Sequence, residues 1–172
     1  MMRKLSLVLL VLALSACLAP ATPSSEPSDT PNTPASTSVA PPSTGVAVVR
    51  VVDGDTIVVA IGGPRGTKVR LIGIDTPERN ECFFRAATER MRALVEGKRV
   101  RLLPDISETD RYGRLLRYMY VGNVFVNALM VSDGFANAAT YPPDVAHAAE
   151  FVNLERVARI AKRGLWAGGC AV

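Results

Sequence analysis

Short apolar runs rich in β-branched residues, separated by turn residues, place the strongest constraint on the fold of this chain. Three such runs follow one another at residues 46–52, 56–61 and 69–74. The first two flank the Asp-Gly-Asp segment 53–55, and an Asp-Gly pair between two such runs predicts a β-hairpin. The glycine-rich segment 62–66 predicts the next turn. The folded part of the chain is therefore expected to begin with three consecutive strands.

The hydrophobic period then changes to that of a helix. Apolar side chains between Phe84 and Val95 share one helical face, and Gly97 ends this element. Later elements are predicted as strands at 99–103 and 115–121, a short helix at 127–132, and a last helix from an Asp144 N-cap to Gly164. This order predicts an α+β protein, namely a five-stranded OB-type β-barrel with three helices.

The first 17 residues have the pattern of a signal peptide. Arg3 and Lys4 precede an apolar stretch of about ten residues, too short to span a membrane stably. The stretch ends in Leu-Ser-Ala-Cys, which resembles the bacterial lipobox and predicts lipidation of Cys17. An ordinary secretory signal and a short membrane anchor are the alternatives.

Residues 18–44 are predicted to form a disordered linker. They are dominated by Pro, Ser and Thr, with Glu26 and Asp29 as the only charged residues. Such a segment cannot bury enough apolar surface to offset the entropy lost on ordering. We therefore expect a signal peptide at 1–17, a linker at 18–44 and a folded domain at 45–172. The domain would be exported and anchored to a membrane of the cell envelope through lipid on Cys17.

Two cysteines remain if Cys17 is lipidated. Cys82 and Cys170 form an even pair, and an exported protein meets an oxidising compartment, so a disulfide between them is predicted. Closing so long a loop would stabilise the domain by about 4–5 kcal/mol. Two free thiols are the alternative.

A single histidine, His147, limits the available chemistry. It argues against a Ser-His-Asp hydrolase, a Cys-His protease and a His-rich zinc site. The formal net charge of +4 does not by itself indicate a nucleic-acid-binding protein. Arginine outnumbers lysine, and its planar fork matches phosphate, although arginine-rich codon usage explains the bias equally well. An enzyme of this composition would use carboxylates for proton transfer and arginines to stabilise charge.

Three acidic residues lie at predicted strand ends or turns: Asp55, Asp75 and Glu78. The preference of aspartate for turns explains Asp53 well. It explains Asp55 and Asp75 less well, because each borders an apolar strand, where an unpaired charge is costly. Two carboxylates that converge with backbone carbonyls form a site for a hard cation such as Ca²⁺ or Mg²⁺.

Two arginines lie within or at the start of predicted apolar strands. Arg70 lies inside an apolar strand, where alternation puts it on the same face as Ile74, so it needs a partner or a ligand. Arg114 begins the fifth predicted strand. The loop before it carries Arg111 and Tyr112, a composition that suits contact with phosphate and stacking on a base. A solvated turn is the alternative for this loop.

Four stretches resemble the staphylococcal nuclease family, in the same order and at similar spacing: "VVDGDTIVV", "VRLIGIDTPE", "TDRYGRLLRYMYV" and "VNALMVSDGFA". The later "RGLW" also resembles the end of family members. Each motif alone has low specificity, but together they extend over essentially the whole predicted domain. The resemblance implies an OB barrel with three helices. It also implies a Ca²⁺-dependent nuclease that cleaves DNA and RNA and leaves 3′-phosphate ends.

The resemblance also implies roles for the matched metal and base positions. The carboxylates of Asp55 and Asp75 and the backbone carbonyl of Thr76 would bind Ca²⁺. Glu78 would orient or deprotonate the attacking water.

Further roles concern the phosphate and the nucleotide. Arg70 and Arg114 would hold the scissile phosphate and stabilise the charge that develops on it. Arg111 and Tyr112 match positions that contact the terminal phosphate of the nucleotide, and Tyr141 falls near a base-stacking tyrosine. The chain is expected to act as a monomer on DNA and RNA.

Two features depart from the type enzyme of the family. Cys82 and Cys170 are absent there, and the segment between Glu78 and the first helix is shorter here. Two alternatives to a nuclease are a catalytically inactive OB-fold module that binds nucleic acid or peptides, and a lipoprotein that binds another partner. The intact set of carboxylates and arginines favours the enzyme.

Overall fold

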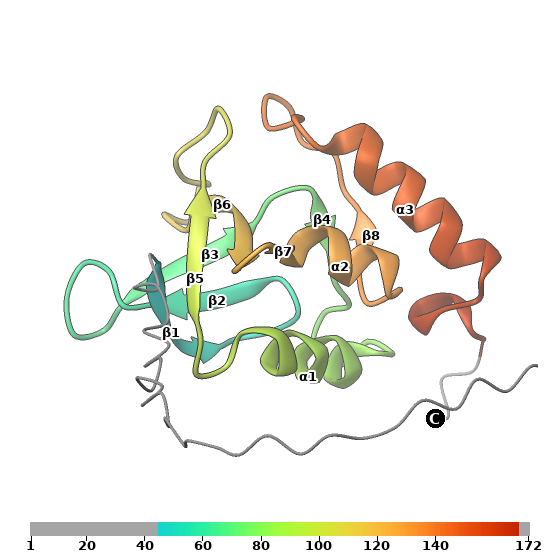
Figure 1. Cartoon of the computed structure of the whole chain (residues 1–172), viewed down its shortest axis with the longest axis horizontal. Coiled ribbons are helices and arrows are strands. Elements are labelled where there is room, and N and C mark those ends of the chain that lie inside the picture. The colour runs from blue at the N-terminus through green and yellow to red at the C-terminus, as the bar shows by residue number, and fades with distance from the viewer. Residues whose placement is uncertain (1–44, 169–172) are drawn as a thin grey trace, which may run out of the picture. The chain divides into compact units, whose positions relative to one another are not determined.

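A computed structural model of the chain, shown in Figure 1, describes residues 45–168. The predicted signal peptide, the lipidation site Cys17, the linker at 18–44 and Cys170 lie outside the described residues. These features, the disulfide with Cys82 included, therefore stay predictions.

The centre of the fold is a closed five-stranded barrel. Neighbouring strands pair in the order β3-β2-β1-β5-β6, and a parallel pairing of β3 with β6 closes the ring. The predicted α+β barrel of OB type is thereby confirmed. Its strands are β1 (Val46–Val51), β2 (Thr56–Val59), β3 (Thr67–Leu71), β5 (Arg99–Leu103) and β6 (Leu115–Val121).

Three α-helices and several short elements surround the barrel. The helices are α1 (Phe84–Val95), α2 (Val126–Ser132) and α3 (Ala148–Ile160). None of the helices within residues 45–168 is long and apolar enough to cross a membrane. The short elements are the paired strands β4 (Ile74–Asp75) and β8 (Asn137–Ala138), the strand β7 (Val124–Phe125) beside β6, and the 3-10 helix η1 (Gly164–Trp166).

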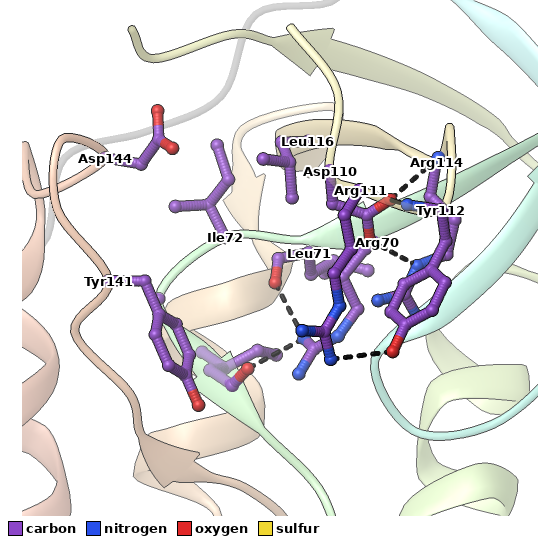
Figure 2. A pocket seen from close by; sticks show the side chains of 12 residues that line it. Arg70, Leu71, Ile72, Asp110, Arg111, Tyr112, Arg114, Leu116, Tyr141 and Asp144 are labelled. Carbon is purple, nitrogen blue, oxygen red and sulfur yellow. Dashed lines mark hydrogen bonds and ion pairs between the residues drawn. The ribbon is translucent and has the colours of Figure 1, made fainter. Parts of the chain in front are cut away.

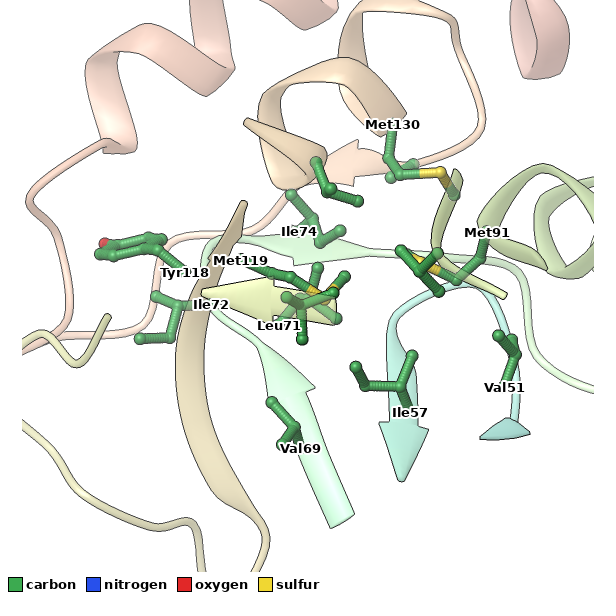
Figure 3. Packing of buried hydrophobic residues seen from close by; sticks show 14 of the residues in the cluster. Val51, Ile57, Val69, Leu71, Ile72, Ile74, Met91, Tyr118, Met119 and Met130 are labelled. Carbon is green, nitrogen blue, oxygen red and sulfur yellow. The ribbon is translucent and has the colours of Figure 1, made fainter. Parts of the chain in front are cut away.

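The hydrophobic core joins the inner face of the barrel to all three helices, and Phe151 is the buried residue that α3 contributes to it. Leu71 of β3 and Met119 of β6 are buried together with Met91 of α1 and Met130 of α2 (Figure 3). Burial of a side chain of this size contributes about 1.5–3 kcal/mol. Because one core spans strands and helices, it also fixes the loops that connect them.

The hairpin predicted around Asp53-Gly54 is present. β1 and β2 pair antiparallel, and the N–H of Val52 donates to the carbonyl of Thr56 at 2.9 Å. A Cβ added at Gly54 would lie 2.8 Å from Thr76 and 2.9 Å from Ala87. Glycine is therefore needed here, because the segment after β4 and helix α1 both approach the turn closely.

The third strand is shorter than predicted. β3 ends at Leu71, and Gly73, with φ of 78°, turns the chain before β4 begins at Ile74. A Cβ at Gly73 would clash with the ring of Phe151 in α3. The predicted alternation from Arg70 to Ile74 is therefore wrong, since a turn that accommodates α3 interrupts it.

The start of the last helix also differs from the prediction. α3 begins at Ala148 with His147 as its N-cap, so Asp144 does not cap it. The Oδ1 atom of Asp144 instead accepts hydrogen bonds from the N–H groups of Ile106 at 3.0 Å and Ser107 at 2.7 Å. The carboxylate holds a distant loop, which a local sequence pattern does not reveal.

Candidate active site

Asp55 joins the β1–β2 turn to the segment that follows β4. Its side chain is buried, with 7% of the residue exposed. Its Oδ2 atom accepts hydrogen bonds from the N–H and the hydroxyl of Thr76, both at 2.9 Å. Its Oδ1 atom accepts one from the hydroxyl of Thr56 at 3.1 Å. Two of the predicted metal-site residues are therefore in direct contact.

Arg70 lies between the two predicted metal-binding carboxylates. Its Nε atom is 3.2 Å from Asp55 Oδ1, and its Nη2 atom donates to Asp75 Oδ1 at 2.9 Å. Its Nη1 atom donates to the carbonyls of Leu71 at 2.9 Å and Ile74 at 2.8 Å. The partners that were predicted for Arg70 from its place in an apolar strand are therefore present. Of its five N–H groups, a single one has no partner within residues 45–168.

Negative charge accumulates around these carboxylates. Burial raises the pKa of Asp75, Arg70 opposes this rise, and the charges of Asp55 and Glu81 add to it. The pKa of Asp53 is also raised, by burial and then by the charge of Asp55. A bound cation would relieve this unfavourable charge.

The donor atoms suit a hard cation. Asp55, Asp75 and the Thr76 carbonyl offer oxygen ligands, which Ca²⁺ prefers. About half of the Asp75 side chain, 49%, is exposed to solvent. No cluster of three or more His, Cys, Asp or Glu side chains within residues 45–168 is arranged to hold a metal. A site here would thus combine two carboxylates with backbone and water oxygens, and the residues fit such a site.

Glu78 projects into solvent directly after a buried segment. Thr76 and Pro77 are buried, whereas Glu78 is exposed. Its carboxylate makes no hydrogen bond or ion pair with any residue from 45 to 168. Its N–H donates to the carboxylate of Glu81 at 2.7 Å. Glu81 was not predicted, because an acidic residue in a loop carries no distinguishing sequence signal.

A cavity of about 500 Å³ brings together the predicted phosphate- and nucleotide-binding residues. Figure 2 shows Tyr112 and Tyr141 on opposite sides of it, with arginine side chains between them. Both tyrosines are largely exposed, at 68% and 65% of the residue. Apolar side chains such as Ile72 and Leu116 form part of the wall. All five predicted residues line this cavity: Arg70, Arg111, Tyr112, Arg114 and Tyr141.

Asp110 holds Arg114 at the cavity. Its Oδ2 atom accepts from Arg114 Nε at 2.6 Å. Its Oδ1 atom accepts from the backbone N–H groups of Arg114 at 3.0 Å and Tyr112 at 2.9 Å. Burial works to raise the pKa of Asp110, but these hydrogen bonds outweigh it and hold the pKa below its ordinary value. Sequence reasoning missed Asp110, although its spacing of four residues from Arg114 was a usable signal.

Arg114 and Arg111 differ in the hydrogen-bond donors that they leave free. Within residues 45–168, both Nη nitrogens of Arg114 lack a hydrogen-bond partner, so its outer fork is available to a ligand. In contrast, the Nη2 atom of Arg111 donates to the hydroxyl of Tyr112 at 2.7 Å.

Comparison with known proteins identifies the family. Residues 68–168 match the family model described as staphylococcal nuclease homologue. The chain belongs to the staphylococcal nuclease family. It is 32% identical over 125 residues to the thermonuclease of Staphylococcus hyicus, an alignment that covers 69% of this chain and 73% of that protein.

Other relatives carry endonuclease names. An uncharacterized endonuclease of Escherichia coli O157:H7 is 39% identical over 121 residues, covering 69% of this chain and 74% of that protein. Endonuclease YncB of Bacillus subtilis strain 168 is 34% identical over 129 residues, covering 70% of this chain and 61% of that protein. The predicted family is therefore confirmed.

In this member of the staphylococcal nuclease family, two aspartates tie the loop after β5 to the segment before α3. Asp144 lines the cavity and holds the loop at 106–107, as described above. Asp105 Oδ2 accepts from the Tyr118 hydroxyl at 2.8 Å and from the N–H of Ala146 at 3.0 Å. Burial and the hydrogen bond to Asp105 raise the pKa of Tyr118, so its hydroxyl stays a donor. Neither contact has a recognisable sequence signal, because both join distant loops.

Proposed function

We propose that this member of the staphylococcal nuclease family is a Ca²⁺-dependent endonuclease that acts on DNA and RNA and leaves 3′-phosphate ends. Hydrolysis of phosphodiester bonds follows from the family and from its nuclease-named relatives. The observation that carries the finer proposal is the position of Arg70. It contacts the Asp55 and Asp75 carboxylates and also lines the cavity that contains Arg114.

The acidic end of the site would hold the metal. A Ca²⁺ ion bound by Asp55, Asp75 and the Thr76 carbonyl would reduce the repulsion between an attacking oxygen and the anionic phosphate. Asp55 is already fixed by Thr76, so this carboxylate is held in place before an ion binds.

Glu78 would act as the general base. Its exposed carboxylate, without a partner in the described part of the chain, would take a proton from water as the water oxygen bonds to phosphorus. The bond from phosphorus to the 5′ oxygen breaks, and the leaving oxygen takes a proton from solvent. The products are a 3′-phosphate and a free 5′-hydroxyl.

The arginines would stabilise the negative charge that develops on the phosphate. Arg114 offers a free outer fork that Asp110 orients, and such a fork can bind two phosphate oxygens. Arg70 contributes mainly its charge, because most of its donors are occupied. A preorganised charge of this kind typically contributes several kcal/mol to transition-state stabilisation.

The tyrosines would place the nucleotide. Tyr112 and Tyr141 are largely exposed at opposite sides of the cavity, and base-aromatic stacking contributes about 1–3 kcal/mol per base. Arg111 beside Tyr112 would contact the terminal phosphate.

The N-terminal pattern supports an extracytoplasmic location. We propose that the nuclease is exported, lipidated on Cys17 and held at the cell envelope by the linker at 18–44, acting there as a monomer. A disulfide between Cys82 and Cys170 belongs to the same proposal, because an oxidising compartment favours it.

Cleavage assays on the full-length chain test the proposed activity. Labelled single- and double-stranded DNA and RNA are incubated with Ca²⁺ or with a chelator. A phosphatase is then used to test whether the new 3′ ends carry a removable phosphate group. We expect Ca²⁺-dependent cleavage with 3′-phosphate ends. Glu78→Gln should lower kcat by about 10²–10⁴-fold, the usual contribution of a general base.

The control is Arg156→Ala, which changes an exposed arginine on α3 away from the cavity and should keep wild-type kcat. Cleavage in the presence of chelator would contradict the metal dependence, and unchanged turnover of Glu78→Gln would contradict the base. Binding of nucleic acid without cleavage by the wild type would instead favour the inactive module.

A further inference from the structure

The turn from Glu78 to Glu81 holds the backbone of the proposed base. The N–H of Glu78 donates to Glu81 Oε2 at 2.7 Å, and the N–H of Glu81 donates back to the Glu78 carbonyl at 2.8 Å. The N–H of Phe84 donates to the Glu81 carbonyl at 3.3 Å, which joins this turn to α1. Glu81 therefore binds Glu78 through both its side chain and its main chain.

The other side of Glu78 is equally constrained. Thr76 is fixed by two hydrogen bonds to Asp55, and the buried ring of Pro77 restricts its own φ angle. The backbone of Glu78 is thus held by Asp55 through Thr76 on one side and by Glu81 on the other. What remains free to rotate is the Glu78 side chain.

We propose that Glu81 is a positioning residue, whose carboxylate accepts the Glu78 N–H and thereby holds the base within reach of the attacking water. The inference rests on the proposed role of Glu78. A displacement of about 1 Å in a catalytic group can cost on the order of 100-fold in rate. Glu78 is exposed and has no side-chain partner within residues 45–168, so its placement depends on its backbone.

The short segment before α1 makes this arrangement possible. It places Glu81 three residues after Glu78, close enough for the two hydrogen bonds to form one turn. The charge of Glu81 also acts on Asp75, so an effect of charge must be separated from an effect of the hydrogen bond. Glutamine keeps an oxygen acceptor without the charge, whereas alanine and methionine keep neither.

Steady-state kinetics on the full-length chain separate these effects. We expect Glu81→Ala to lower kcat about tenfold with the KM for DNA unchanged, as for a modest displacement of the base. Glu81→Gln should rescue most of this loss. The double variant Glu78→Gln/Glu81→Ala should be no slower than Glu78→Gln alone, because a residue that acts through Glu78 has no effect without it.

Two further variants keep the test decisive. Glu89→Ala removes another exposed glutamate, in α1, and should keep wild-type kcat. Glu81→Met, of similar length but without an acceptor, repeats the test should Glu81→Ala lower the Tm into the assay range.

Several results would overturn the proposal. Equal losses in Glu81→Gln and Glu81→Ala would assign the effect to charge. Wild-type kcat in both Glu81→Ala and Glu81→Met, or a further loss in the double variant, would remove Glu81 from the role. Wild-type kcat in Glu78→Gln would instead refute the proposed base, which distinguishes the two failures.

Discussion

The carboxylate of Asp55 receives two hydrogen bonds from Thr76, from its N–H and from its hydroxyl, each at 2.9 Å. These bonds connect a β-turn to a segment 21 residues later in the chain. Gly54 leaves the space for this approach, since a side chain there would clash with Thr76. This buried contact and the ion pairs of Arg70 with Asp55 and Asp75 together fix the geometry of the acidic end of the site.

Removing the hydrogen bond from the Thr76 hydroxyl to Asp55 should weaken both the stability of the fold and the binding of Ca²⁺. Thr76→Val loses the hydroxyl donor at nearly constant volume, and we expect it to lower the free energy of unfolding by about 1–3 kcal/mol. Urea unfolding with and without Ca²⁺ measures both effects. Thr67→Val is the matched control, because the Thr67 hydroxyl donates to Ile61 at 2.8 Å in an exposed position. Equal losses in the two variants would contradict a special role for Thr76.

Replacement of Arg70 by lysine and replacement of Arg114 by lysine should have different consequences. Arg70→Lys loses several contacts that hold β3 and β4, so both stability and kcat should fall. Arg114→Lys loses only the hydrogen bond from Nε to Asp110, so it should lower the free energy of unfolding less than Arg70→Lys, but it should lower kcat about 10²–10³-fold, because lysine cannot supply a fork. Denaturant unfolding and kinetics are measured on the same samples. A larger stability loss in Arg114→Lys than in Arg70→Lys would refute this assignment.

The hold of Asp110 on Arg114 should depend on pH. The folded-state pKa of Asp110 is lowered, so its stabilising contribution is complete above its ordinary pKa and disappears as the pH falls through the lowered value. Asp110→Asn should therefore be less stable than wild type at pH 7, by about 1–3 kcal/mol, and this difference should shrink below about pH 4. Urea unfolding across this range measures it, with the exposed Glu89→Gln as control. A difference that stays constant with pH would contradict the prediction.

Calcium should stabilise the wild type through Asp75. At a Ca²⁺ concentration about 100-fold above Kd, binding raises the free energy of unfolding by about 2.7 kcal/mol. In chelator at pH 7, Asp75→Asn should be at least as stable as wild type. The raised pKa of Asp75 means that its ionised form is disfavoured in the folded state.

Thermal unfolding with Ca²⁺ and with chelator tests this pattern without any activity measurement. The Tm of the wild type should rise with Ca²⁺, whereas that of Asp75→Asn should rise little. An equal rise in both would place the metal elsewhere.

The sequence predicted those parts of the fold that depend on local patterns. The runs around Asp53-Gly54 and the helical period from Phe84 to Val95 correspond to a hairpin and to α1. It failed where a distant contact decided the local structure. Gly73 interrupts the third strand because Phe151 packs against it, and Asp144 binds another loop instead of capping α3.

The candidate site shows the same division. The predicted cavity residues converge, and all of them except Tyr141 lie in the motifs that carried the resemblance. The residues that hold this set in place were not predicted. Asp110 and Glu81 bind backbone N–H groups in turns, and Asp105 joins loops that are far apart in the sequence. Such contacts depend on three-dimensional proximity, which periodicity and composition do not encode.

The parallel pairing of β3 with β6 has a consequence for when activity can arise. In this ladder Val69 lies opposite Leu115 and Arg70 opposite Leu116, and Arg114 directly precedes the paired segment. The spacing of the two arginines is therefore set by main-chain bonds between distant parts of the sequence. Such long-range pairing forms late in folding, after loop-closure entropy has been overcome. A nascent or half-folded chain thus lacks the spacing of Arg70 and Arg114, and the proposed cleavage site is complete only once the barrel has closed.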